Sequence, residues 1–242
     1  MLQNLPVFIS IIFILTTSAT LLFFHWIIRD SNIEAVRKRA NIVLLVLMIW
    51  LIIQAGLAIG NVYSSDTTSV PPKILLFGVV PMLLTIILLF ITKKGGLFID
   101  SLPLKNITWL NIIRIPVELV LLELFIHKAV PQLMTFEGRN FDVLSGITAP
   151  FVAYFGFTKK VLNRKIILAW NFICLALLAN IVINAVLSAP FFLQRFAFDQ
   201  PNIAILYFPF NWLPAFIVPV VLFGHLVSIR QLIRSQTQSN NK

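Results

Sequence analysis

The chain has 242 residues, of which 59% are hydrophobic and only 12% are charged, and its formal net charge is +10. Soluble domains carry about 25% charged residues, so this composition, together with repeated apolar runs, excludes an ordinary soluble domain and predicts the membrane class. The single cysteine, Cys174, excludes an intramolecular disulfide and a CxxC metal or redox motif.

The apolar runs predict one all-α domain over residues 1–242, a bundle of seven transmembrane helices. A helix needs about 20 residues to cross a hydrocarbon layer of about 30 Å, and lipid forces backbone groups to bond within their own segment. The first run follows "MLQNLPVFIS", which lacks Lys and Arg and so predicts a retained helix instead of a cleaved signal peptide. The predicted helices cover residues 5–28, 40–62, 73–92, 107–129, 142–158, 166–189 and 205–229.

Basic residues gather in the segments that follow the first, third, fifth and seventh predicted helices, as in "RKR" at 37–39 and "KK" at 159–160. The positive-inside rule then predicts a multi-pass protein of the bacterial inner membrane, with its N-terminus outside and its C-terminus cytoplasmic. The segment "GGLFIDSLPLKN" is predicted to lie along the inner interface. This placement explains the net charge, and no basic patch interleaved with aromatic residues suggests a nucleic-acid partner.

The fourth predicted helix places ionisable groups in "NIIRIPVELVLLELFIHKAV", residues 111–130. A charge at a helix centre costs about 2.5–3.5 kcal/mol on insertion scales. Arg114 and Glu118 should therefore face other helices, and their spacing of one turn predicts that they pair with each other. Asn111 falls on the same face, and Pro116 weakens the helix between them. Two interpretations stay open: an ion pair that fixes helix packing, or the wall of a ligand site.

A second group of charges lies nearer the predicted outer end of this helix. Glu123 and His127 are one turn apart and either reach headgroups and water or line an outward vestibule. The following "FEGRNFD" adds Glu137, Arg139 and Asp142, which form either a solvated loop or a cap tethered to the bundle. In the ligand-site interpretation these five residues form the mouth of the site, with Arg114, Glu118 and Asn111 deeper.

Two histidines suggest one cofactor. His25 and His225 lie near the cytoplasmic ends of the first and last predicted helices, where they either mark the headgroup boundary or ligate a haem between helices. No other cofactor is predicted, and no metal site is predicted because further ligands are missing. Amides in other helices, such as Gln54 and Asn211, either join helices or hydrate a cavity.

The blocks "MTFEGRNFDVLSGITAP" and "FAFDQPNIAILYFPFNWLPAFIVP" resemble those of a bacterial multi-pass membrane protein family that has no assigned activity. The resemblance covers most of the chain and implies a seven-helix inner-membrane protein, with no catalytic roles to transfer. The seventh predicted helix has no lysine for a retinal Schiff base, and no repeat of three helices supports a PQ-loop transporter.

The charges in and after the fourth helix predict binding or transport of a small polar or amphipathic ligand that enters from the outer side. A rival is a membrane-embedded enzyme that acts on a lipid or isoprenoid-like substrate, with Glu118, Glu123 or Glu137 as acid or base and His127 as partner. A haem-binding electron carrier and a structural subunit of a membrane complex are further alternatives.

Overall fold

The computed structural model describes residues 5–240, and the side chains of residues 5–234. It confirms the all-α class, because 73% of the chain is helical and the described residues contain no strand. The main helices are α1 (Val7–Arg29), α3 (Ala40–Ile59), α4 (Val80–Ile91), α7 (Arg114–Ile126), α8 (Val143–Ala153), α9 (Arg164–Ser188) and α10 (Val218–Asn240). Shorter helices are α2 (Glu34–Arg37), α5 (Lys93–Ser101) and α6 (Leu104–Leu110).

Six further turns adjoin or connect these helices. Three are π-helical: η1 (Leu75–Val79), η4 (Tyr154–Thr158) and η6 (Leu213–Ile217). Three are 3₁₀ turns: η2 (Asn111–Ile113), η3 (Gln132–Met134) and η5 (Ala204–Leu206). The predicted helices therefore correspond to α1, α3, η1–α4, α6–η2–α7, α8–η4, α9 and η6–α10.

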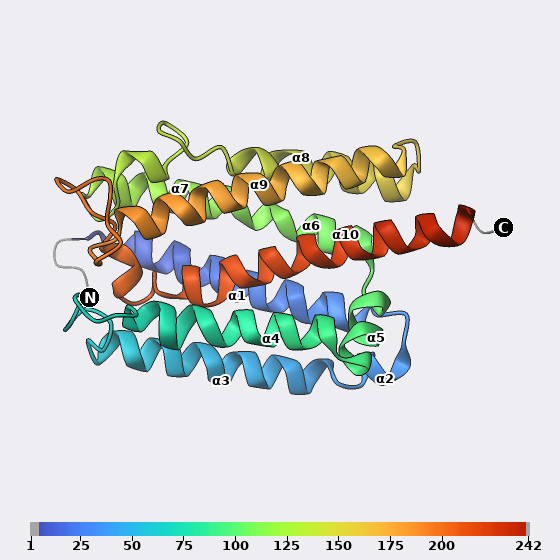
Figure 1. Cartoon of the computed structure of the whole chain (residues 1–242), viewed down its shortest axis with the longest axis horizontal. Coiled ribbons are helices and arrows are strands. Elements are labelled where there is room, and N and C mark those ends of the chain that lie inside the picture. Colours follow the sequence, from blue (N-terminus) through green and yellow to red (C-terminus); the bar gives the residue numbers. More distant parts are fainter. Residues whose placement is uncertain (1–4, 241–242) are drawn as a thin grey trace.

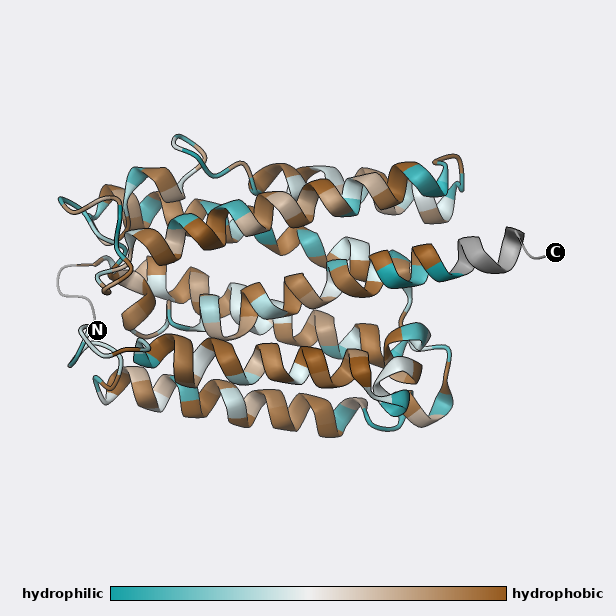
Figure 2. Ribbon diagram, in the orientation of Figure 1, coloured by the Kyte–Doolittle hydropathy of each residue, from teal (hydrophilic) through white to brown (hydrophobic). Residues whose placement is uncertain are grey.

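The long helices run along one axis, and α1 and α10 lie between the α3–α4 side and the α7–α9 side (Figure 1). Helix α1 starts at one end of the bundle and α10 finishes at the other. The main apolar core draws on α1, α7 and η6–α10, and it includes Phe13, Leu124 and Phe216. Hydrophobic residues cover the lengths of the helices, and hydrophilic residues collect near their ends (Figure 2).

Four helices in the described range are long and apolar enough to cross a membrane: Val7–Arg29, Glu34–Ile59, Arg164–Ser188 and Leu213–Arg234. A fifth is counted if Leu75–Ile91 and Lys93–Ser101, bent by 93°, form one broken span. The other two predicted spans fall short of that test. The span predicted at residues 107–129 is interrupted by η2 and carries charges. The span predicted at residues 142–158 corresponds to Val143–Thr158, which is a shorter apolar helix.

A proline explains why α3 is joined to η1–α4. Pro81 has no N–H, so the carbonyl of Phe77, four residues earlier, loses its α-helical donor. The side chain of Gln54 on α3 donates to this carbonyl from Nε2 over 3.0 Å, and its Oε1 accepts from the Tyr63 hydroxyl over 2.6 Å. Burial raises the pKa of Tyr63 to about 12, so the hydroxyl keeps its proton at neutral pH. Gln54 thus bonds both to a buried hydroxyl and to a carbonyl that Pro81 leaves without its α-helical donor.

The same chemistry joins α3 to η6–α10. Pro219 leaves the carbonyl of Ala215 without an α-helical donor, and the indole of Trp50 donates to it from Nε1 over 2.9 Å. One turn away along α3, the carbonyl of Gln54 accepts from Nδ2 of Asn211 over 2.9 Å. Side chains and carbonyls of α3 therefore fix the two π-helical turns η1 and η6 in place.

Replacing Gln54 by Leu should destabilise the fold by about 2 kcal/mol, because it leaves the Tyr63 hydroxyl buried without its partner and removes the side-chain donor to the Phe77 carbonyl. Thermal unfolding of the purified protein in detergent measures this effect. The matched control is Gln132→Leu at an exposed position, which should change stability by no more than about 0.5 kcal/mol. Equal losses in the two variants would contradict the bridging role of Gln54.

The start of α7 is shaped by a 3₁₀ turn, a proline and a close contact with α8. Pro116 lies in the first turn of α7, and the residues just before Arg114 form the 3₁₀ turn η2. Helix α8 packs closely there, because a Cβ on Gly146 would lie 3.3 Å from Cβ of Arg114.

Most of the segment predicted to lie along the inner interface belongs to α5, which is turned 93° from η1–α4. Thr92 caps α5, because its side chain accepts from the Gly95 amide over 3.1 Å.

Candidate functional site

Arg114 begins α7 and is buried, with 3% of its surface exposed. Its Nη1 donates to Oδ1 of Asp142, the residue immediately before α8, and the two form a buried ion pair. The prediction that Arg114 pairs with Glu118 is therefore wrong. The physical reason is that the loop after α7 folds back onto the bundle and brings in a carboxylate from 28 residues away, which the helical spacing alone does not reveal.

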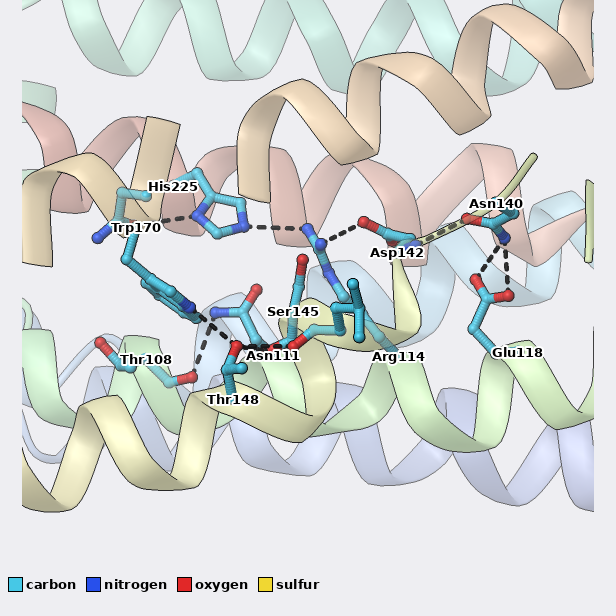
Figure 3. Close-up of polar contacts among 12 residues, drawn as sticks. Thr108, Asn111, Arg114, Glu118, Asn140, Asp142, Ser145, Thr148, Trp170 and His225 are labelled. Atoms are coloured by element: carbon cyan, nitrogen blue, oxygen red, sulfur yellow. Dashed lines mark hydrogen bonds and ion pairs between the residues drawn. The ribbon is translucent and has the colours of Figure 1, made fainter. Parts of the chain in front are cut away.

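His225 on α10 bonds to the second terminal nitrogen of the Arg114 guanidinium. Nη2 of Arg114 lies 3.0 Å from Nε2 of His225, and Nδ1 of His225 lies 3.0 Å from Oδ1 of Asn171 on α9 (Figure 3). Arginine has only donors, so Nε2 must accept and Nδ1 must carry the proton, which Asn171 accepts. Nδ2 of Asn171 donates to the carbonyl of Ile167 over 2.9 Å, which orients the amide accordingly. His225 is therefore neutral in this arrangement.

Glu118 lies one turn further along α7 and is 2% exposed. Nδ2 of Asn140 lies 2.6 Å from Oε1 and 2.7 Å from Oε2 of Glu118 (Figure 3). The same nitrogen lies 3.0 Å from the carbonyl of Met134. One amide group thus serves both carboxyl oxygens. Oδ1 of Asn140 also accepts from the backbone amide of Asp142 over 3.0 Å, so a single loop residue positions both acids.

A pocket of about 120 Å³ adjoins these acids, between η1, α7, α9 and η6–α10. Arg114, Glu118 and Asp142 are the ionisable residues in its lining, and the remaining lining residues in the described chain are apolar. Two walls are the π-helical turns η1 and η6, a geometry frequent at functional sites. The apolar lining is Ile74, Leu75, Val79, Val117, Leu121, Met134, Leu178, Ile181, Val182, Ala185, Val186, Phe191, Ile205, Leu213, Pro214, Ile217, Val218 and Val221.

Other residues predicted for the site lie outside this lining. Asn111 is buried but bonds locally, from Nδ2 to the carbonyls of Ile107 and Thr108. His127 donates from Nδ1 to the carbonyl of Glu123 over 2.8 Å, and the side chains of these two residues are partly exposed. Glu137 and Arg139 are exposed. The structure therefore brings together Arg114, Glu118 and Asp142 but not the other five.

The predicted haem ligands lie in different surroundings. His25 is half-buried, with Nδ1 3.2 Å from the carbonyl of Ala40. His225 is fully buried and both of its ring nitrogens are engaged, so neither is free to ligate an iron in this arrangement. Among residues 5–240, no group of three or more His, Cys, Asp or Glu side chains could hold a metal ion.

Sequence reasoning missed Asn140 and Asn171 as members of this cluster. Asn140 stands inside "FEGRNFD", the segment for which a tethered cap was one of two interpretations, and its burial favours that interpretation for Asn140 and Asp142. Asn171 is in the first half of α9, among apolar residues. An amide inside an apolar helix was the available signal, but nothing in the sequence pairs it with His225.

No curated protein and no solved structure matches the chain. One family profile, described as a domain of unknown function (DUF8737), matches residues 71–233. The matched region contains the whole pocket lining as well as Asn140, Asn171 and His225, and it excludes α1 and α3. Since the match covers more than half of the sequence, the chain belongs to the DUF8737 family.

Proposed function

We propose that the chain is a multi-pass protein of the bacterial inner membrane, with its N-terminus outside, that binds or transports a small amphipathic ligand in the pocket beside α7. The observation that carries this proposal is the lining of the pocket, which is apolar except for Arg114, Glu118 and Asp142. Ligand sites are mostly apolar with a few placed polar groups, and ionisable groups within membrane helices mark functional sites.

The lining favours access from the hydrocarbon instead of the outer aqueous side predicted from the sequence. The half-buried lining residues are all apolar and come from η1, α9 and the start of η6–α10: Leu75, Val79, Val182, Ala185, Val186, Leu213, Pro214 and Val218. Towards the loops, the pocket is lined by the buried side chains of Met134, Phe191 and Ile205. An amphipath already dissolved in the bilayer would enter between η1 and α9.

The arrangement supports binding more than acid–base catalysis. Glu118, a candidate general acid or base, bonds to Asn140, whereas its predicted partner His127 contacts Glu123 outside the lining. Within the described residues, the pocket lining contains no histidine. The pair predicted for acid–base catalysis, Glu118 with His127, is therefore not brought together in the pocket.

A bulky side chain that fills the pocket should prevent ligand binding, which tests the proposal. Ala185 on α9 lines the pocket, while Ala179 on the same helix is exposed and outside the lining. Native mass spectrometry of the protein extracted from membranes should detect a bound amphipath on the wild type and on Ala179→Phe, and none on Ala185→Phe. A bound species that persists in Ala185→Phe, or that is absent from the wild type, would contradict the proposal.

A further inference from the structure

We infer that the ligand is a single-chain amphipath with an uncharged hydroxyl head, that is, a long-chain alcohol whose head group binds between Arg114 and Glu118. The inference rests on the proposed function, since it assigns the head group of the ligand held in that pocket. Arg114 and Glu118 are one turn apart on α7, and both line the pocket.

The charges around the pocket disfavour an anionic head. The positive charge of Arg114 is matched by Asp142, and its two terminal nitrogens already bond to Asp142 and His225. An incoming carboxylate or phosphate would meet an arginine that is already paired and two acids, Asp142 and Glu118, in the same lining. The Arg114–Asp142 pair is neutral as a whole, so an anionic head would add a buried charge without a counter-ion.

One unsatisfied donor and one carboxyl group with spare acceptor sites favour a hydroxyl. Nε of Arg114 is buried and has no hydrogen-bond partner in the described part of the chain. The two oxygens of Glu118 share one amide nitrogen, although a carboxylate offers about four acceptor sites. A hydroxyl can accept from Arg114 and donate to Glu118 at once, whereas an ammonium has donors only and leaves Nε without a partner.

The shape of the pocket limits the tail. Its volume of about 120 Å³ is close to the roughly 150 Å³ of an engineered apolar cavity that holds one benzene. Such a space takes the first carbons of one chain and excludes a bulky head or two chains side by side. The remaining tail would pass the half-buried apolar rim on η1 and α9 into the surrounding hydrocarbon.

The test uses the full chain in lipid nanodiscs and three photoreactive probes with the same tail: tetradecanol, tetradecylamine and tetradecanoic acid. We expect half-maximal labelling by the alcohol at a concentration at least about tenfold lower than by the amine or the acid. Glu118→Gln should weaken labelling by the alcohol about tenfold and reduce its advantage over the acid. The control Glu123→Gln, on the same helix but outside the lining, should leave all three unchanged.

The outcomes separate this inference from the proposed function. Suppose that the amine or the acid labels the protein as strongly as the alcohol does, and that Ala185→Phe still abolishes this labelling. The ligand then binds in the pocket but does not need a hydroxyl head, so this inference fails while the proposed function holds. Labelling by all probes that survives in Ala185→Phe overturns the pocket itself. If Glu118→Gln does not fold, the comparison of head groups on the wild type decides alone.

Discussion

Replacing either partner of the Arg114–Asp142 pair should destabilise the protein by about 3–5 kcal/mol, because a buried charge is left without its counter-ion. Both side chains are almost fully buried, at 4% and 7% side-chain exposure. The double variant Arg114→Met, Asp142→Asn should lose clearly less than the sum of the single variants, since it removes both charges together. Denaturant unfolding in detergent gives the four stabilities of the cycle.

The chain offers a matched pair for comparison. Lys38 and Glu34 form an ion pair at 2.8 Å, with side chains 75% and 67% exposed. The same cycle on this pair should give a coupling of at most about 0.5 kcal/mol, because water and side-chain entropy offset the attraction. Couplings of equal size in the two cycles would show that burial adds nothing to the Arg114–Asp142 pair.

Replacing Gly95 by Ala should destabilise the protein by about 3 kcal/mol or more. Gly95 lies at the start of α5, where the chain turns 93° from α4, and an added Cβ would lie 2.2 Å from the carbonyl oxygen of Leu89. The contact is with backbone, so the bend must open to relieve it, and overpacking of this kind is costly. Thermal unfolding measures the loss, and an intact melting temperature would mean that the bend is adaptable.

Gly56 supplies the control for the same substitution. It lies in α3, and apart from the adjoining backbone of this helix and the two neighbouring residues, nothing lies within 4 Å of a Cβ added there. Gly56→Ala should therefore be neutral or stabilise the protein by up to about 1 kcal/mol, as alanine favours the helical backbone. The contrast between the two variants isolates the close approach at the bend from any general effect of losing a glycine.

Helix positions were predictable because long apolar runs specify them, and the predicted ranges agree with the observed helices to within a few residues at most ends. The largest differences are at the last helix, which was predicted over residues 205–229 but begins with η6 at Leu213 and ends at Asn240. Residues 205–212 are apolar, but η5 and the following turn interrupt them. Hydrophobicity alone does not distinguish an apolar loop packed on a bundle from a helix.

The site was predicted only in part, because helical spacing identifies neighbours on one helix and not across helices. Burial of Arg114 and Glu118 followed from the cost of charge in lipid, and the structure agrees. Their partners, Asp142 and Asn140, lie beyond a loop. His225 was predicted to mark the headgroup boundary or to ligate a haem, and its contacts with Arg114 and Asn171 were not predicted. Prolines offered an unused signal: Pro81 and Pro219 each predict a freed carbonyl that a donor on another helix must satisfy.

Helix α10, with the η6 turn before it, is tied at three levels: Trp50 holds the Ala215 carbonyl, Arg114 holds His225, and Asp100 on α5 pairs with Arg230 and Arg234. Helix α9 is held at its far end as well: Nδ2 of Asn180 donates to the carbonyl of Arg139 over 2.8 Å, and Nδ2 of Asn202 donates to the carbonyl of Ala185 over 3.2 Å. The pocket therefore lies between two anchored helices and is preorganised, so a ligand that binds there does not bear the entropic cost of ordering these walls.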